Sequence, residues 1–375
     1  MALIQGLLSG ELDDGERLGV HLGNCLECLA CEPACPSLVQ FGALMDGARA
    51  HRVAQLPIWR QVLSRLRFDL LADPRMPTLL ALSSAVYRYT GLSFVLRRLG
   101  LLRRGRLAVL DGLAGQLREP TNLQIAAGPN ALQCQSSNHA SGSSAATEGA
   151  DRAAAEVGLF LGCVSRGLQP STAQATLRVL THLGITVRVP HEQVCCGAMH
   201  RHNGHPAAAE QLLARNRDAF GSASVVGFAS ACVAELRDQL TAEELCRFLV
   251  DRPWPARLRL RPLPALVAVH EPCSHRNLLR DTQAAYDLLA RIPELRVAGL
   301  DGNDSCCGAA GTFLLDHPET ALTLAADKVR HVAALAPSYL VTTNTGCAAH
   351  LAARLRAAGS DIEVVHPVEL IARQL

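Results

Sequence analysis

The sequence carries almost no net charge, since 36 lysines and arginines face 34 aspartates and glutamates, a formal balance of +2. A nucleic-acid-binding chain normally shows a clear basic excess, so this balance argues against DNA or RNA as a partner. No apolar run reaches the roughly 18 residues of a membrane-spanning helix, and arginines interrupt even the leucine-rich part at 96–102. We therefore expect no transmembrane segment, while peripheral association with a membrane surface stays open.

The signatures of several enzyme classes are also missing. No glycine-rich dinucleotide fingerprint follows a predicted strand and no nucleophile elbow is present, so we expect no catalytic residue and no substrate site on this chain. Met1 leads into Ala-Leu-Ile-Gln-Gly without the basic segment of a secretory signal. Many cysteines in a long chain without such a signal are typical of metal ligation in a reducing compartment. We expect a cytoplasmic protein, free or at the inner face of the membrane.

Cysteine is abundant, with fourteen residues, and four of them lie in one short run. The run consists of Cys25, Cys28, Cys31 and Cys35, closed by Pro36. Its C-x2-C-x2-C-x3-C-P spacing is that of bacterial [4Fe–4S] ferredoxins, in which two-residue gaps let three thiolates curl around one corner of a cluster. A zinc knuckle is the alternative, although zinc sites usually pair two C-x2-C knuckles across a longer loop. The run predicts a [4Fe–4S] cluster.

Cys35 is the ambiguous member of this run. In two-cluster ferredoxins the fourth cysteine of each run ligates the other cluster, and this sequence contains a single run. Three arrangements follow. Cys35 closes the same cluster as the first three cysteines, or the site has three cysteines only, or Cys35 serves a second cluster that this sequence does not supply.

The regions on either side of residue 118 differ in composition. Within residues 1–118, apolar side chains recur at helical spacing, for example at Trp59, Val62, Leu63 and Leu66. This pattern predicts an all-helical, ferredoxin-like domain around the cysteine run. Its many arginines fit solvated helix faces or, alternatively, a surface that docks a partner.

Residues 119–153 change character, because Ser, Gly, Ala, Asn and Gln replace the bulky apolar residues. Such a composition is typical of a flexible linker. Cys134 lies in this stretch and is interpreted as incidental.

Beyond the linker the sequence repeats itself, with a first module at 154–255 and a second at 264–375. The cysteine spacing is C-x31-C-C-x35-C in the first module and C-x32-C-C-x39-C in the second. Strands and helices alternate in the same order in both, so an internal duplication and two α/β modules with parallel sheets are predicted. A helix with Ser171 as N-cap is expected to end at Gly184. His-Pro pairs at 205–206 and 317–318 are expected to open helices. The expected strands include 157–163, 185–189, 224–229, 295–300 and 339–343.

In each module the outer cysteines follow predicted strands and the paired cysteines lie in the loop after another strand. Because the carboxyl ends of parallel strands share one edge of a sheet, four thiols of each module can converge there. Four thiolates suit an iron–sulfur cluster or zinc, and Gly197 and Gly308 allow the tight bend after each pair. Buried structural cysteines are the alternative. The predicted metal ligands are Cys163, Cys195, Cys196 and Cys232, and Cys273, Cys306, Cys307 and Cys347.

Other residues near these motifs are interpreted more cautiously. Cys246 has no counterpart in the second module and is interpreted as a core or surface thiol. His275 and Arg276 could place donors near cluster sulfurs or a bound anion. Histidines close to the motif cysteines are expected to pack or to form hydrogen bonds rather than to bind metal; they are His200, His202, His270, His275 and His350.

This arrangement resembles the iron–sulfur subunit of glycolate oxidase, also called glycolate dehydrogenase, over nearly the whole chain. The segments that carry the resemblance are 26–36, 183–187, 195–198, 306–312 and 343–347. The modules are also similar to those of the heterodisulfide reductase catalytic subunit, lactate-utilisation proteins and anaerobic glycerol-3-phosphate dehydrogenase subunits. The resemblance implies a subunit that takes electrons from FAD-binding partner subunits, which oxidise glycolate to glyoxylate, and passes them towards quinone.

The sequence departs from these relatives in the modules. Heterodisulfide reductase modules end in C-x2-C, whereas Glu235 and His350 stand three residues after the last cysteine here. This difference argues against a non-cubane cluster and against direct disulfide chemistry. A thiol–disulfide reductase subunit nevertheless remains an alternative function, as does a non-enzymatic zinc or cluster scaffold.

The family also normally carries two ferredoxin-type runs. Residues 1–11 resemble the family's helix between the two runs. We therefore expect Met1 to be an internal residue of a longer product, in which Cys35 serves the cluster of an upstream run.

Overall fold

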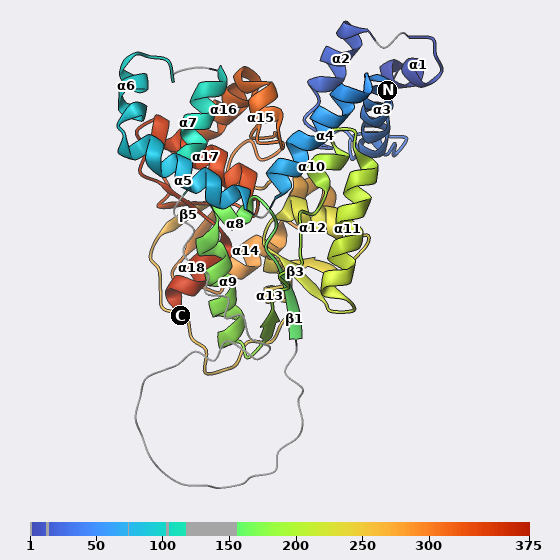
Figure 1. Cartoon of the computed structure of the whole chain (residues 1–375). Coiled ribbons are helices and arrows are strands. Elements are labelled where there is room, and N and C mark those ends of the chain that lie inside the picture. Colours follow the sequence, from blue (N-terminus) through green and yellow to red (C-terminus); the bar gives the residue numbers. More distant parts are fainter. Residues whose placement is uncertain (1, 13–14, 74, 103–104, 118–155) are drawn as a thin grey trace.

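The computed structural model describes residues 2–12, 15–73, 75–102, 105–117 and 156–375 (Figure 1). The predicted linker at 119–153, with Cys134, lies outside the described residues. Within the described part, no single helix is long and apolar enough to cross a membrane. Two consecutive helical segments, Thr78–Tyr89 and Leu92–Arg98, are together long and apolar enough, but the chain bends by 65° between them.

The described part of residues 1–118 is helical, as predicted, and contains no strand. The cysteine run lies in an irregular loop between α2 and α3, above a small core that includes Leu22 and Met45. Nothing in these helices identifies a ferredoxin-like domain, which stays a prediction. The helices are α1 (Ala2–Leu8), α2 (Glu16–Gly23), α3 (Phe41–Gln55), α4 (Ile58–Ala72), α5 (Met76–Tyr89), α6 (Leu92–Arg98) and α7 (Gly105–Ala114).

The two modules form two four-stranded sheets in which every strand pair is parallel, in the orders β2-β1-β3-β4 and β6-β5-β7-β8. The identical order confirms the predicted α/β modules with parallel sheets. The central strands are buried on both faces, as is usual for parallel sheets covered by helices. The strands are β1 (Glu156–Phe160), β2 (Thr186–Arg188), β3 (Val225–Gly227), β4 (Ala242–Glu244), β5 (Leu266–Val269), β6 (Arg296–Gly299), β7 (Tyr339–Val341) and β8 (Glu363–Val365).

Helices connect these strands. Pro206 and Pro318 open helices as predicted, and Gly184, at φ +74°, follows the end of α9. Ser171 is not an N-cap, because the helix already begins at Pro170 and Gln169 takes the cap position. The helical elements are α8 (Ser165–Leu168), α9 (Pro170–His182), α10 (Ala198–Arg201), α11 (Pro206–Phe220), α12 (Ser230–Leu236), α13 (Leu245–Val250), η1 (Ser274–Leu279), α14 (Gln283–Leu289), α15 (Phe313–Asp316), α16 (Pro318–Leu335), α17 (Thr345–Ala357) and α18 (Pro367–Gln374).

The two modules interlock instead of standing apart. Helix α18 of the second module packs on α9 of the first, and α13 of the first packs on α14 of the second. Two side chains at matching positions cap these helices: Glu244 accepts a hydrogen bond at the start of α13, and His366 accepts one at the start of α18. One apolar core contains buried residues of both sheets, among them Leu159, Val226 and Val341. The modules therefore share a core.

The N-terminal helices lie over the ends of the sheets from which the cysteine loops emerge (Figure 1). Helix α4 packs on α10, α5 packs on α8, and α7 packs on α15, α16 and α17. Since α8, α10 and α15 lie close to the motif cysteines in the chain, this arrangement places the cysteine loops between the helical layer and the two sheets.

Candidate metal centres

The structure brings the four cysteines of the first module together. Cys163 follows β1, Cys195 and Cys196 lie in the loop after β2, and Cys232 is in α12 after β3. The Sγ atoms of Cys163 and Cys195 are 3.4 Å apart, and Cys196 forms side-chain hydrogen bonds with both Cys195 and Cys232. The first three thiols are buried, and that of Cys232 is partly buried. We call this group the first centre.

Contacts between the thiols of the first centre shift their pKa values in opposite directions. Hydrogen bonds with Cys163 and Cys196 lower the pKa of Cys195 well below its usual range. The same contacts with Cys195 raise the pKa of Cys163 and of Cys196. His200, whose Nε2 lies 3.0 Å from an Asp69 carboxylate oxygen, is among the groups that lower the pKa of Cys195. The imidazole thus has the hydrogen-bonding role expected for it.

Polar side chains outside any motif hold the first Cys-Cys-Gly loop. The Asn216 side chain accepts a hydrogen bond from the Val194 N–H and donates one to the Cys195 carbonyl, both at 2.9 Å. The Gln193 side chain accepts a hydrogen bond of 2.9 Å from the Leu161 N–H. Both side chains are buried. Sequence reasoning missed Gln193 and Asn216, because a single amide residue gives no spacing signal.

The four cysteines of the second module also converge. Cys273 follows β5, Cys306 and Cys307 lie in the loop after β6, and Cys347 is in α17 after β7. The Sγ atoms of Cys307 and Cys347 are 3.2 Å apart, and Cys306 forms side-chain hydrogen bonds with Cys273 and Cys307. The N–H of Gly308 donates to the Cys306 sulfur at 3.3 Å. We call this group the second centre.

Two thiols of the second centre ionise readily. Hydrogen bonds with Cys273 and Cys307 lower the pKa of Cys306 to about 3, and the bond with Cys307 lowers that of Cys347 to about 6. The same bonds raise the pKa of Cys273 and of Cys307. Cys306 and Cys347 are therefore the more acidic thiols of the centre. Binding of a metal requires deprotonated thiols and releases their protons.

A fully buried lysine lies near the second centre. Lys328, the single lysine of the sequence, lies in α16, and its Nζ donates a hydrogen bond to the Gly302 carbonyl. Burial lowers the pKa of Lys328, and the nearby sulfurs of Cys307 and Cys306 raise it. Lys328 stands ten residues after Pro318, as Asn216 stands ten residues after Pro206. The duplicated position thus carries a neutral amide near one centre and an ammonium group near the other.

The N-terminal run brings three of its four cysteines close together. Cys25 and Cys31 both act electrostatically on the Cys28 thiol, and burial raises the pKa of Cys25 and of Cys28. The backbone is left-handed at Glu27 (φ 50°) and Leu29 (φ 55°), an uncommon conformation for such residues. This conformation accompanies a turn in which the Glu27 N–H donates to the Cys25 sulfur at 3.4 Å.

Cys35 stands apart from the other three. Its thiol accepts hydrogen bonds from the backbone N–H groups of Val39, Ser37 and Leu38, which lower its pKa. Within the described part of the chain, no other cysteine is among the groups that act on it. These contacts are compatible with the arrangements in which Cys35 does not share the cluster of the first three cysteines.

The run lies against the second centre. The side chain of Asn277, in η1, donates a hydrogen bond of 2.6 Å to the Cys28 carbonyl. Cys306 is among the groups that act on the Cys28 thiol, and Cys28 is among those that act on Cys273. Two of the three cysteine groups therefore adjoin each other, although they are more than 200 residues apart in the sequence.

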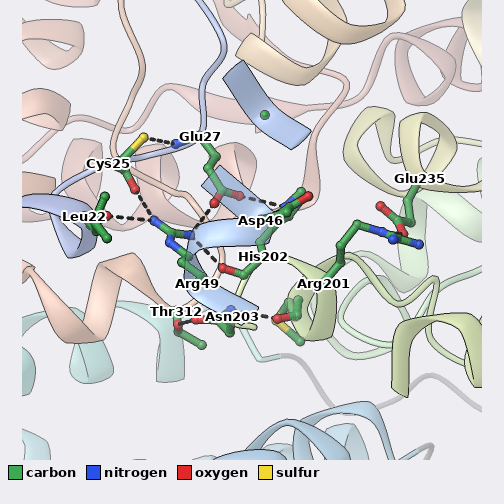
Figure 2. A network of polar contacts seen from close by, with 12 residues as sticks. Leu22, Cys25, Glu27, Asp46, Arg49, Arg201, His202, Asn203, Glu235 and Thr312 are labelled. Carbon is green, nitrogen blue, oxygen red and sulfur yellow. Dashed lines mark hydrogen bonds and ion pairs between the residues drawn. The ribbon is translucent and has the colours of Figure 1, made fainter. Parts of the chain in front are cut away.

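A polar network joins the run to the first module (Figure 2). Arg49 of α3 donates hydrogen bonds to the carbonyls of Cys25 (2.8 Å) and His202 (2.6 Å) and forms an ion pair of 2.5 Å with Glu27. The Nδ1 atom of His202 lies 2.7 Å from a Glu27 oxygen and 3.0 Å from an Asp46 oxygen. Three charged side chains of the helical part thus fix the loop that carries Cys25 on the end of α10.

The charge of His202 makes this docking dependent on pH. Burial alone would lower the pKa of His202, but hydrogen bonds with Asp46 and Glu27 raise it from 6.5 to about 10. A raised pKa in the folded state means that the stabilisation is complete below about pH 6.5 and is lost as pH rises through about 10. We expect the difference in Tm between the wild type and His202→Gln to be largest near pH 6.5 and to shrink by pH 10.

Thermal unfolding across this pH range tests that prediction. His182→Gln is the matched control, because His182 is exposed and contacts only the carbonyl of Arg178 in its own helix among the contacts described. Its effect on Tm should be small at every pH. A His202→Gln variant whose Tm deficit stays constant from pH 6.5 to 10 would show that the network does not depend on the charge of His202.

The remaining candidates have other partners. His275 and His350 form hydrogen bonds with Thr343 (2.7 Å) and with the Ala321 carbonyl (3.1 Å), as expected for histidines that pack. Arg276 lies 3.4 Å from a Glu271 oxygen, so its charge is paired. Cys246 is fully buried, which decides between the core and surface alternatives in favour of the core.

The donor sets of both centres fit a metal. In each centre four cysteine sulfurs converge, and most of them are buried. Two of the sulfurs touch, at 3.4 Å in the first centre and 3.2 Å in the second. Sulfur donors in this number suit an iron–sulfur cluster or zinc. The fifth position of heterodisulfide reductase modules is not a donor here. Glu235 forms an ion pair of 2.7 Å with Arg201, and His350 contacts the Ala321 carbonyl.

Comparison with known proteins agrees with this geometry. The family model for the cysteine-rich domain, CCG, matches residues 157–237 and 267–352, which contain the two centres. The chain is 25% identical over 406 residues to the probable glycolate oxidase iron–sulfur subunit of Bacillus subtilis (strain 168), covering 99% of this chain and 86% of that protein.

Shorter matches extend the comparison. Lactate utilization protein A of Halalkalibacterium halodurans is 25% identical over 237 residues, covering 58% of this chain and 97% of that protein. A fumarate reductase (CoM/CoB) subunit of Methanothermobacter marburgensis is 29% identical over 227 residues, covering 57% of this chain and 45% of that protein. These matches support an iron–sulfur, electron-transferring role of the oxidoreductase type. Both modules thus match the model of the cysteine-rich CCG domain, and the resemblance of the chain to the glycolate oxidase iron–sulfur subunits is confirmed.

Proposed function

We propose that this chain is the iron–sulfur subunit of a glycolate or related 2-hydroxyacid dehydrogenase complex, relaying electrons from FAD-binding subunits towards quinone. The observation that carries the proposal is the convergence of eight module cysteines into two centres, with the N-terminal run against the second. The similarity to a probable glycolate oxidase iron–sulfur subunit along 99% of the chain supports the choice of complex. We place this complex in the cytoplasm or at the inner face of the membrane.

The proposed ligands follow from the three groups of cysteines. Cys25, Cys28 and Cys31 would hold three corners of a [4Fe–4S] cluster, and the two centres would each hold a further cluster or zinc. A bound iron–sulfur cluster supplies one-electron transfer. The protein's part is to bury the sulfurs, to donate N–H groups to them as Glu27 and Gly308 do, and to fix the groups relative to one another. We propose 1–118, 154–255 and 264–375 as the domains that do so.

The contact between Cys28 and Asn277 supports a route for electrons. It ties the run to η1, the segment that begins directly after Cys273 of the second centre. Electron transfer needs closely spaced redox groups, and this contact brings two of them together. We therefore propose that electrons pass between the run and the second centre.

An exposed apolar surface on α4, α5 and α6 supports the proposal that a partner protein binds this chain. Soluble monomers rarely expose large contiguous apolar patches, and larger ones usually mark interaction sites. Nine large apolar side chains on these helices are more than half exposed: Ile58, Trp59, Val62, Leu63, Leu79, Leu82, Val86, Tyr89 and Phe94. We propose that the FAD-binding subunits dock here. Peripheral binding to a membrane is the alternative use of the same surface.

Metal analysis followed by reduction tests the proposal. The chain purified without oxygen should contain about four irons per cluster site and show a spectrum that bleaches with dithionite. Addition of glycolate should bleach it only when the FAD-binding subunits are present. Stoichiometric zinc without a reducible spectrum would favour a scaffold. Reduction of a disulfide substrate by the chain, without any response to the flavoprotein, would favour the thiol–disulfide reductase.

A further inference from the structure

His270 is a buried imidazole whose polar surroundings are the sulfurs of the second centre. Its side chain is 2% exposed, and no nitrogen or oxygen atom among the described residues forms a hydrogen bond with its Nδ1 or Nε2. Its hydrogen-bonding partner is the Cys347 side chain, and this bond contributes to the lowered pKa of Cys347. His275 and His350 differ from it, because their partners are the Thr343 hydroxyl and the Ala321 carbonyl.

The position of His270 beside two sulfurs of the second centre makes it a candidate ligand. A ring nitrogen of His270 and the sulfurs of Cys307 and Cys347 all lie within 4.8 Å of one another, and the two sulfurs are 3.2 Å apart. His270 directly follows the last residue of β5, so it emerges at the same edge of the sheet as the cysteine loops. Imidazole nitrogen and thiolate sulfur are donors that iron and zinc both accept.

The first module has no nitrogen at the position that matches His270. His270 stands three residues before Cys273, and Phe160 stands three residues before Cys163. The ring of Phe160 packs against that of Phe220, with centroids 6.2 Å apart, and is buried. The duplicated position therefore carries a hydrocarbon ring in one module and a nitrogen ligand type in the other.

We infer that His270 binds the metal of the second centre, which is thereby a mixed nitrogen and sulfur site. This inference rests on the metal-binding role proposed for the centres and names one further ligand.

Pulsed EPR on the full chain tests this ligand. The protein is labelled with 15N-histidine, loaded with iron and sulfide without oxygen, and reduced with dithionite. We expect one strongly coupled histidine nitrogen in the wild type, lost in His270→Ala and His270→Cys. It should be retained in His350→Ala, the matched control, because His350 is also buried near the second centre but contacts the Ala321 carbonyl. Absence of the coupling in the wild type, or its persistence in His270→Ala, overturns the inference.

Zinc-edge X-ray absorption on the zinc-loaded chain provides a second measurement. The wild type should show a nitrogen contribution that His270→Cys replaces by sulfur and that His350→Ala leaves unchanged. Sulfur-only ligation in both measurements overturns the inference while the proposed function stands. Failure to form any reducible cluster contradicts the proposed function, and the zinc measurement then still decides about His270. His270→Cys supplies a thiolate in place of the imidazole, so a folded variant remains if His270→Ala unfolds.

Discussion

Replacement of Cys306 by serine should empty the second centre and leave the first one loaded. Cys306 contacts both Cys273 and Cys307, and these hydrogen bonds lower its pKa to about 3, so it is a ready thiolate at neutral pH. A serine hydroxyl stays protonated there and cannot replace a soft sulfur donor. For a cubane cluster the expected loss is about four irons per chain, measured by metal analysis together with the EPR signals of the remaining clusters.

Cys246→Ala is the matched control for this experiment. Cys246 is as deeply buried as the ligand cysteines, but its neighbours are Glu244 and His366 and not the sulfurs of a centre. Its replacement should leave the metal content unchanged and lower the free energy of unfolding by about 1 kcal/mol, the usual effect of a small cavity. A Cys306→Ser chain that keeps its full metal content would contradict the assignment of Cys306 as a ligand.

The arrangement of the two centres could be predicted because it depends on topology. Buried strands that alternate with helices specify a parallel sheet, and the carboxyl ends of its strands share one edge. Cysteines placed after strands therefore meet, as Cys163 and Cys195 do. The second module has nearly the same cysteine spacing, so its cysteines meet in the same way. The strands β4 and β8 were not predicted, because three residues with polar members give no clear periodicity.

Features that depend on contacts between distant segments were not predictable. Periodicity correctly indicated the helix around Trp59, but it does not say whether another surface covers the apolar face, and Trp59 is 61% exposed. The contact between Cys28 and Asn277 joins segments with no shared motif. His270 was one of five histidines near the cysteines, and only its place within 4.8 Å of the Cys307 and Cys347 sulfurs separates it from His275 and His350.

Gly308→Ala is expected to disrupt the second centre although it removes no ligand. Gly308 follows the cysteine pair with φ at +88°, a conformation that costs a residue with a side chain about 1–2 kcal/mol. A Cβ at this position would lie 2.8 Å from the Cα atom and from the carbonyl oxygen of Ala321 in α16. Overpacking against backbone typically costs about 1–3 kcal/mol. The free energy of unfolding should fall by about 2–5 kcal/mol, measured by denaturant unfolding.

Gly184→Ala separates the two contributions to this cost. Gly184 has φ at +74°, but nothing lies within 4 Å of its Cβ position. Its replacement should cost only the conformational part, about 1–2 kcal/mol, and should leave the metal content intact. In Gly308→Ala, relief of the overlap must move either α16 or the loop that carries Cys306 and Cys307, so metal should be lost from the second centre. Equal effects of the two substitutions on stability, with full metal content in both, would show that the loop tolerates a side chain after the cysteine pair.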